Sequence, residues 1–432
     1  MGTAKRIRIV GFPFFFIILF LVQTLFNGFQ YWTMDLFVQA AILNSFILIG
    51  IYAFRGFEYN NGSNLNSSIV TFGAGTLAGT LVAFIPILIF YDPRISQNHI
   101  ILTVVVSCFL NPVIFSLYMK AYIKSLPKTK VLIIGNLEEI EPIIKEIEEK
   151  SLGKICAYKY IDPSVMTLER DIDEQSGFSE VLITNPNLEK NILAQVENVK
   201  QKGIKVHYLP KIAEEYLQRI PIQVAVNFKE YYRIAFDGIK ESPSKRVLDV
   251  IIAILAFIIL SPVMCIFALG IYLEDGKPIV FKQERIGQDG KRFIMHKFRT
   301  MKNESESTAK FVTDEQHRIL KIGKIMRPVR LDEIPQFWDI LTGKMSFIGP
   351  RPEQPHFVEE YKDNIPFYFE RHRLKSGLTG WAQITYQYAS NMEETAKKLS
   401  YDLFYIKNRN TVFDLRIILQ TLETVLWKRG AK

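Results

Sequence analysis

Long apolar runs without charge constrain the fold of this chain more than any other feature. No charged residue occurs between Arg8 and Asp35, and the run from residue 9 reads IVGFPFFFIILFLVQTLFNGF. As a helix, such a run can cross a hydrocarbon core of about 30 Å. Three more apolar runs follow, at roughly Leu36–Phe54, Ile69–Tyr91 and Ile100–Tyr122. The sequence therefore predicts a four-helix transmembrane bundle over residues 1–124. The first run is too long for a signal peptide, so we expect the chain to keep it.

The positions of Lys and Arg predict the orientation of this bundle, because basic residues favour the cytoplasmic side. Basic residues precede the first run and follow the fourth: Lys5, Arg6, Arg8, Lys120, Lys124, Lys128 and Lys130. We expect both ends of the bundle, and everything after it, to be cytoplasmic, although Arg94 in the second outer loop points the other way. The stretch GAGTLAG, Gly73–Gly79, lacks the Lys-Ser/Thr of a phosphate loop and predicts close helix packing instead.

Residues 125–238 predict a soluble α/β domain of Rossmann type. Buried strands (KVLIIGN, KICAYKYID, SEVLITNP, IKVHYLP) alternate with helical stretches, which is typical of a parallel sheet. A dinucleotide site needs several glycines at the first turn, and here Gly135 stands alone ahead of Glu138, Glu139 and Glu141. The pattern favours a structural or regulatory role. The DID stretch, Asp171–Asp173, has the form of the metal-binding DxD of nucleotide-sugar transferases, a form with low specificity on its own.

A fifth apolar run begins at Lys245, and its uncharged part is Val250–Leu273. Ser261 and Pro262 lie in its middle, where proline removes a backbone hydrogen bond. Both flanks of the run are basic, so both favour the cytoplasmic side. We expect a re-entrant hairpin that breaks at Ser261-Pro262, with a single kinked membrane span as the alternative. Such a hairpin would hold a soluble domain of residues 239–432 against the membrane face.

The last third concentrates positive charge. The net charge of the chain is +9, and Lys277 to Arg330 hold fourteen Lys or Arg against six Asp or Glu. The six histidines show no HxxxH or HExxH spacing and the three cysteines are scattered, so neither zinc nor a disulfide framework is predicted. The basic residues fall in compact blocks with turn residues: FKQERIG, HKFRTM, RPVRLDE, MSFIGPRPE and SGLTGWAQ. These blocks predict binding to a diphosphate and to the membrane, and no nucleic acid partner.

Asp332 and Glu333 follow one of these basic blocks and precede Ile-Pro. One interpretation is that an acid caps the following helix. The other is that a positioned carboxylate acts as a covalent nucleophile. A carboxylate that approaches a phosphate needs cations nearby, since two unit charges at 4 Å repel by about 4 kcal/mol at an effective dielectric of 20.

Together, these motifs resemble the bacterial sugar transferase family, the monotopic phosphoglycosyl transferases that start lipid-linked glycan assembly. The layout is similar to the large polyprenyl glycosylphosphotransferase branch, and the ending resembles exopolysaccharide-associated members. The resemblance is strong from about Lys245 to the C-terminus and is one of layout before that. It departs from the usual pattern at Ser376, where the family commonly has Pro, and in TYQYAS after WAQ.

The resemblance implies roles for individual residues. Asp332 would attack the β-phosphate of a nucleotide diphosphosugar, and Glu333 would assist it in binding Mg²⁺ or Mn²⁺ or in handling a proton. The implied substrate contacts are Lys297, Arg299, Arg351 and Arg371. Asp402 and Asp414 match family positions but are equally consistent with structural ion pairs or caps.

The function that the resemblance implies is transfer of a sugar 1-phosphate, expected from a UDP-sugar, to polyprenyl phosphate at the bacterial inner membrane. The phosphosugar would pass through a covalent intermediate on Asp332. Two alternatives remain open: a non-catalytic membrane scaffold of glycan assembly, and a processive glycosyltransferase that releases UDP. Homo-oligomers and downstream glycosyltransferases are further possible partners, while the sugar, the lipid length and the pathway are left open.

Overall fold

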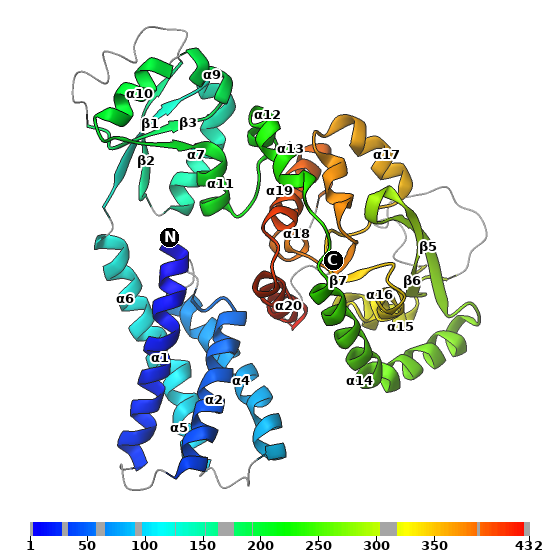
Figure 1. Cartoon of the computed structure of the whole chain (residues 1–432). Coiled ribbons are helices and arrows are strands. Elements are labelled where there is room, and N and C mark those ends of the chain that lie inside the picture. The colour runs from blue at the N-terminus through cyan, green and yellow to red at the C-terminus, as the bar shows by residue number, and fades with distance from the viewer. Residues whose placement is uncertain are drawn as a thin grey trace. The chain divides into compact units, whose positions relative to one another are not determined.

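The computed structural model describes residues 3–27, 33–57, 65–90, 97–125, 127–151, 153–162, 177–191, 193–302, 318–386 and 389–426. Two compact units make up the chain, Met1–Lys128 and Thr129–Lys432. The first consists of helices, and the second combines helices with three small sheets over its described residues (Figure 1). Arg94 and the Asp171–Asp173 pair lie outside the described residues.

The first unit contains the predicted apolar helices. Its elements are α1 (Thr3–Asn27), α2 (Met34–Ala53), α4 (Leu65–Phe90), α5 (Gln97–Val105), the π-helical turn η2 (Val106–Leu110) and α6 (Asn111–Ser125). Within the described residues, four helical segments are long and apolar enough to cross a membrane: Met34–Ala53, Leu65–Ile87, Ile100–Tyr122 and Pro243–Asp275. Three of them confirm that predicted spans are apolar helices long enough to cross a membrane. The first predicted span is also helical, but its apolar stretch, Gly11–Leu25, is shorter.

Polar side chains join the helices inside this unit. The Gln23 side-chain amide donates to Asn44 Oδ1 (3.1 Å) and to Thr103 Oγ1 (2.7 Å), which links three helices. The π-helical turn directly precedes Pro112, whose missing N–H interrupts the α-helical ladder. Here the Asn111 N–H donates to the Val106 carbonyl. Gln23, Asn44 and Thr103 thus satisfy one another's buried polar groups within the bundle.

Glycines bring α2 and α4 into backbone contact. A Cβ added at Gly75 would lie 2.4 Å from the Ile51 Cα, and one added at Gly79 would lie 2.3 Å from the Phe46 carbonyl oxygen. Neither position has room for any side chain. Close helix packing, as predicted for GAGTLAG, is therefore confirmed.

The second unit begins with a parallel sheet of order β2-β1-β3-β4. The strands are β1 (Thr129–Ile134), β2 (Ile155–Ile161), β3 (Glu180–Ile183) and β4 (Lys205–Tyr208). The accompanying helices are α7 (Leu137–Lys150), α9 (Pro186–Asn191), α10 (Leu193–Gln201) and α11 (Leu209–Leu217). The predicted parallel α/β arrangement is confirmed.

Gly135, at the end of β1, has a packing role. A Cβ at this position would lie 1.9 Å from Thr184 Oγ1, a hydroxyl that donates to the Ile134 carbonyl (2.8 Å). The next residue, Asn136, caps α7 by accepting from the Glu138 N–H (3.1 Å). The lone glycine is thus explained by its neighbours in the sheet.

The rest of the second unit contains short strands and many helices. The strands are β5 (Val280–Ile286), β6 (Arg292–Phe298), β7 (Ser346–Ile348) and β8 (Gly377–Thr379), with β5–β6 antiparallel and β7–β8 parallel. The helices are α12 (Ile222–Asn227), α13 (Lys229–Asp237), α14 (Pro243–Asp275), η3 (Gln288–Gly290), α15 (Lys321–Met326), η6 (Arg327–Val329), η7 (Leu331–Glu333), α16 (Gln336–Leu341), α17 (Pro355–Asn364), η8 (Tyr368–Arg373), α18 (Trp381–Thr385), α19 (Met392–Asn408) and α20 (Thr411–Leu426).

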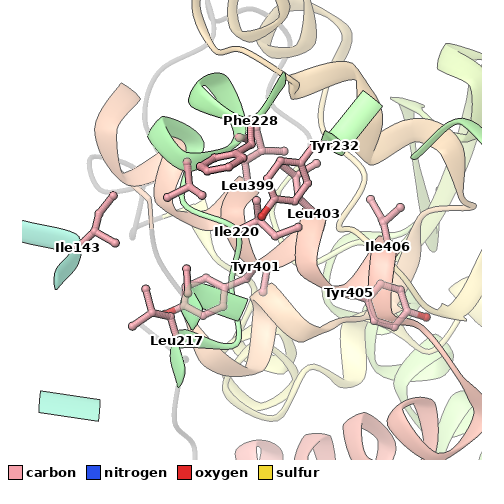
Figure 2. Close-up of a cluster of buried hydrophobic side chains, with 14 of the residues drawn as sticks. Ile143, Leu217, Ile220, Phe228, Tyr232, Leu399, Tyr401, Leu403, Tyr405 and Ile406 are labelled. Atoms are coloured by element: carbon pink, nitrogen blue, oxygen red, sulfur yellow. The ribbon is translucent and has the colours of Figure 1, made fainter. Parts of the chain in front are cut away.

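One hydrophobic core joins the parallel sheet to the rest of this unit. Figure 2 shows Phe228 and Tyr232 close to Leu399 and Leu403 of α19. Hydrogen bonds reinforce the junction, since the Ile220 N–H donates to the Ser400 carbonyl (2.9 Å). The α/β domain therefore packs directly on the C-terminal helices. The predicted division of this unit at residue 238 stays a prediction.

The fifth apolar run is a helix without a break. Helix α14 runs from Pro243 to Asp275 with Pro262 inside it, and Figure 1 shows it bent into two arms. Proline cannot donate to the Ile258 carbonyl four residues back. The Ser261 hydroxyl donates to that carbonyl instead (3.0 Å). The predicted break at Ser261-Pro262 was therefore wrong in its secondary structure: the chain bends there but stays helical.

The contact between α2 and α4 gives a stability prediction. We expect Gly75→Ala to destabilise the bundle by about 1–3 kcal/mol, because the new methyl group would overlap the α2 backbone. The measurement is thermal unfolding of the purified protein in detergent. Gly73→Ala is the matched control in the same helix, since a Cβ there meets nothing within 4 Å. Equal melting temperatures for the two variants would contradict this packing.

Candidate active site

Asp332 and Glu333 lie in the short helical turn η7, between two other helical segments. Arg330, which precedes this turn, has a positive φ of 54°. Such a conformation is costly for a residue with a side chain, and it is typical of functional sites. The following helix, α16, begins at Gln336, and its N-cap residue is Pro335. The interpretation of Asp332 or Glu333 as the N-cap of this helix was therefore wrong.

Glu333 forms a partly buried ion pair with Arg351. The Arg351 Nη2 donates to Glu333 Oε1 at 2.7 Å, and Nη1 donates to Gln383 Oε1 at 3.3 Å. Burial alone would raise the pKa of Glu333, but Arg351 and Arg330 outweigh it and hold this pKa below its usual range. Glu333 is therefore a permanent negative charge that fixes the direction of the Arg351 guanidinium.

Asp332 has the opposite electrostatic balance. Burial, together with the charge of Glu333, raises the pKa of Asp332, while Lys297 and Arg327 act in the other direction. Burial and the nearby Arg351 lower the pKa of Lys297 to about 8. The structure thus brings together four predicted residues, Asp332, Glu333, Lys297 and Arg351. Two carboxylates and two cations, with Glu333 buried and the other three half-buried, have the composition expected for phosphoryl chemistry.

Other cations near this set were not singled out from the sequence. Arg285 donates through Nη1 to the Pro352 carbonyl (3.2 Å). The Arg285 Nε and Arg327 Nη1 are buried and have no hydrogen-bond partner among the described residues. Both residues belong to basic blocks that the sequence does show, FKQERIG and RPVRLDE. Guanidinium groups with donors to spare are suited to an anionic ligand.

Arg371 binds the backbone of the site residue Arg351. Its guanidinium donates to Asp402 Oδ2 (3.0 Å), the Tyr368 hydroxyl (2.9 Å) and the Arg351 carbonyl (3.0 Å). The side chain is 4% exposed, and these protein groups take up its donors except for Nε. Arg371 therefore stabilises the backbone conformation of Arg351, and Asp402 is the ion-pair partner of Arg371.

Arg299 and Asp414 bind other partners than the acidic pair in the described contacts. Arg299 Nη2 donates to the carbonyls of Asp275 (2.8 Å) and Gly276 (3.0 Å), so it closes the C-terminal end of α14. Asp414 accepts from the Tyr405 hydroxyl at 2.7 Å. Neither contact involves the site cluster, and both contribute to the framework.

The first turns of α14 are bound to the segment that carries the site. Lys245 Nζ donates to the Ile348 carbonyl (2.7 Å), and Arg246 donates to the carbonyls of Ile340 (2.6 Å) and Leu341 (2.7 Å). In the sequence these two cations were interpreted as a cytoplasmic flank of the apolar run. Lys245 is 6% exposed, and its ammonium group binds protein atoms, not lipid headgroups.

The cluster could hold a divalent cation only with help from a ligand. In the described part of the chain, no group of three or more His, Cys, Asp or Glu side chains could hold a metal ion. Mg²⁺ usually takes one or two carboxylates and completes its shell with substrate phosphates and water. Asp332 and Glu333 fit that pattern as donors, although Arg351 already occupies one oxygen of Glu333.

Comparison with known proteins places this cluster in a family. Residues 240–428 match the model of the family described as "Bacterial sugar transferase". A relative from Bacillus subtilis strain 168, "Uncharacterized sugar transferase EpsL", is 36% identical over 190 residues, which are 43% of this chain and 89% of the relative. The chain belongs to the bacterial sugar transferase family.

Two longer relatives of the family carry substrate names. One from Aeromonas hydrophila, "UDP-N-acetylgalactosamine-undecaprenyl-phosphate N-acetylgalactosaminephosphotransferase", is 40% identical over 189 residues, or 44% of this chain and 45% of the relative. The other, "UDP-glucose:undecaprenyl-phosphate glucose-1-phosphate transferase" from Escherichia coli K12, is 39% identical over 181 residues, or 41% of this chain and 39% of the relative. The chain therefore spans less than half of the length of each.

The burial of Arg371 gives a prediction that separates support from substrate binding. We expect Arg371→Met to lower the free energy of unfolding by about 3–5 kcal/mol, because Asp402 would remain as a buried charge without its partner. The measurement is thermal or denaturant unfolding. The control, Arg373→Met, removes a cation that is 30% exposed and should cost less than about 1 kcal/mol. A fully stable Arg371→Met protein with a raised KM would instead assign Arg371 to the substrate.

Proposed function

We propose that this chain transfers a sugar 1-phosphate from a UDP-sugar to undecaprenyl phosphate, with Asp332 as the nucleophile. The observation that carries the proposal is the partly buried set of Asp332, Glu333, Lys297 and Arg351 within the segment that matches the family. The names of the longer relatives support the two substrates. The sugar differs between those relatives, so no sugar is assigned.

In the first proposed step, a carboxylate oxygen of Asp332 attacks the β-phosphorus of the UDP-sugar. The bond from that phosphorus to the bridging oxygen breaks, UMP leaves with the electron pair, and an acyl phosphate joins the sugar to Asp332. In the second step, a phosphate oxygen of the lipid attacks the same phosphorus. The Asp332 carboxylate leaves, and the lipid now carries a diphosphosugar. Neither step changes an oxidation state.

The surrounding cations would make these steps possible. A carboxylate and a diphosphate repel each other, and Lys297, Arg327 and Arg351 supply positive charge where they meet. The spare donors of Arg285 and Arg327 are suited to the phosphate oxygens. A bound Mg²⁺ or Mn²⁺, held by Asp332 and Glu333 together with the diphosphate, would neutralise further charge.

We also propose that the site works at the cytoplasmic face of the bacterial inner membrane. The apolar helices of the first unit and the bent, apolar α14 support membrane attachment. If α14 enters and leaves on the same side, it holds residues 239–432 at the headgroups, where a lipid phosphate lies. The four-helix bundle and the α/β domain would then be accessory domains. Homo-oligomers and downstream glycosyltransferases stay predictions.

The nucleotide that is released tests the reaction. Purified protein with undecaprenyl phosphate and Mg²⁺ should release UMP from one member of a panel of UDP-sugars, and Asp332→Asn should lose this activity by at least about 10³-fold. The Asn side chain keeps the size of the carboxyl group but cannot form the acyl phosphate. The measurement is chromatographic separation of UMP from UDP.

Other outcomes have distinct meanings. Release of UDP would contradict the covalent mechanism and indicate a glycosyltransferase. A folded protein that is silent with every sugar would favour a scaffold role.

The lowered pKa of Lys297 gives a pH prediction. Lys297 is a cation below its pKa of about 8 and loses its charge above it. We expect kcat/KM of the free enzyme to fall about fivefold between pH 8 and pH 9 as this charge is lost. Lys297→Arg stays charged throughout, so its pH profile should be flat in this range even if its activity is lower overall. An unchanged fall in that variant would exclude Lys297 as the titrating group.

A further inference from the structure

A buried carboxylate binds the outer edge of strand β6. Asp339 of α16 is fully buried, and its Oδ2 accepts from the His296 N–H at 2.9 Å. Its other oxygen, Oδ1, lies 2.7 Å from the His296 Nδ1. Both carboxylate oxygens are thus directed to one residue of the strand, through its backbone and its side chain.

The register of the strands explains why this edge needs a partner. Among the strands of the described residues, β6 pairs only with β5, and the Arg299 N–H donates to the Ile279 carbonyl just beyond β5. In an antiparallel pair, N–H groups alternate between the partner strand and the opposite edge. The His296 N–H therefore points away from β5. The Asp339 carboxylate fills the place that a third strand would occupy.

Asp339 also binds the segment that leads to Arg351. Its main-chain carbonyl accepts from the Lys344 N–H (2.9 Å) and the Met345 N–H (3.1 Å), at the turn before β7. Strand β6 carries Lys297 directly after His296, and η7 with Asp332 contacts β6. Asp339 thus binds strand β6 through its side chain and the turn before β7 through its main chain, while η7 packs against β6.

We propose that His296 and Asp339 are positioning residues that hold Lys297 at its working distance from Asp332. This inference rests on the proposed function. The pair does not touch the reacting groups, so its effect is exerted through Lys297. A shift of about 1 Å in a charged group at a reacting centre can cost about 10²-fold in rate.

The test is a double-mutant cycle with Lys297 in the full-length protein. Asp339→Leu should lower kcat/KM for UMP release by about 10²-fold in the native background. In a Lys297→Met background the same change should cost less than about twofold, because the group that Asp339 positions is already gone. Asp339→Asn should retain activity within about threefold, since an amide can accept from the N–H and donate to a neutral imidazole.

Matched variants keep the test decisive. Glu148→Gln alters a similar contact far along the chain, where Glu148 Oε1 accepts from the strand N–H of Ala157 at 2.5 Å. We expect this change to have the same small effect in both backgrounds. His296→Leu keeps the backbone bond to Asp339. If Asp339→Leu fails to fold, His296→Leu replaces it in the double-mutant cycle with Lys297→Met.

Two failures can be told apart. If the native protein releases UMP but the effects of Lys297 and Asp339 or His296 variants simply multiply, the positioning role is overturned while the proposed function stands. If the native protein releases no UMP from any sugar, the proposed function fails and the positioning role fails with it.

Discussion

The site depends on polar side chains at the start of α14 that bind the backbone of the segment between Asp332 and Arg351. Lys245 and Arg246 donate to carbonyls at the end of α16 and in β7. Asp249, one turn later, accepts from the Phe347 N–H at 2.9 Å. Buried carbonyls and N–H groups are costly without partners, so these bonds hold a short and irregular segment in one conformation. These bonds fix the charged cluster to the start of the apolar helix α14.

Such rigidity is what the electrostatics of the cluster require. The charged form of Glu333 is stabilised by Arg351, whose Nη2 lies 2.7 Å from Glu333 Oε1. The backbone of Arg351 is fixed in turn by a hydrogen bond from Arg371 to its carbonyl. Water would screen these charges, whereas burial makes each of them strong and sensitive to distance. Asp332 lies beside the negative charge of Glu333, which opposes its ionisation. The nearby cations Lys297 and Arg327 oppose this effect and favour the charged form of Asp332.

Much of this arrangement could be predicted from local sequence. Apolar length predicted the helices, and alternation of strand and helix predicted the parallel sheet. Both inferences depend on neighbours within one stretch of chain, whereas the cluster around Asp332 was implied by the family resemblance. The bend at Pro262 was predicted, but a continuous helix was only the alternative interpretation, because the bond from the Ser261 hydroxyl to the Ile258 carbonyl depends on side-chain geometry.

Long-range partners set the limit of that approach. A sequence shows that Lys245 and Arg371 are cations, but it does not show that one meets a carbonyl about a hundred residues away and the other meets Asp402. Lys245 was interpreted by its charge as part of a membrane flank, and the family resemblance implied that Arg371 is a substrate contact. In the structure both cations donate to main-chain carbonyls at or near Arg351: Lys245 to that of Ile348 and Arg371 to that of Arg351 itself. In a site made of short turns, the cations that bind a phosphate work only if other cations first bind the protein.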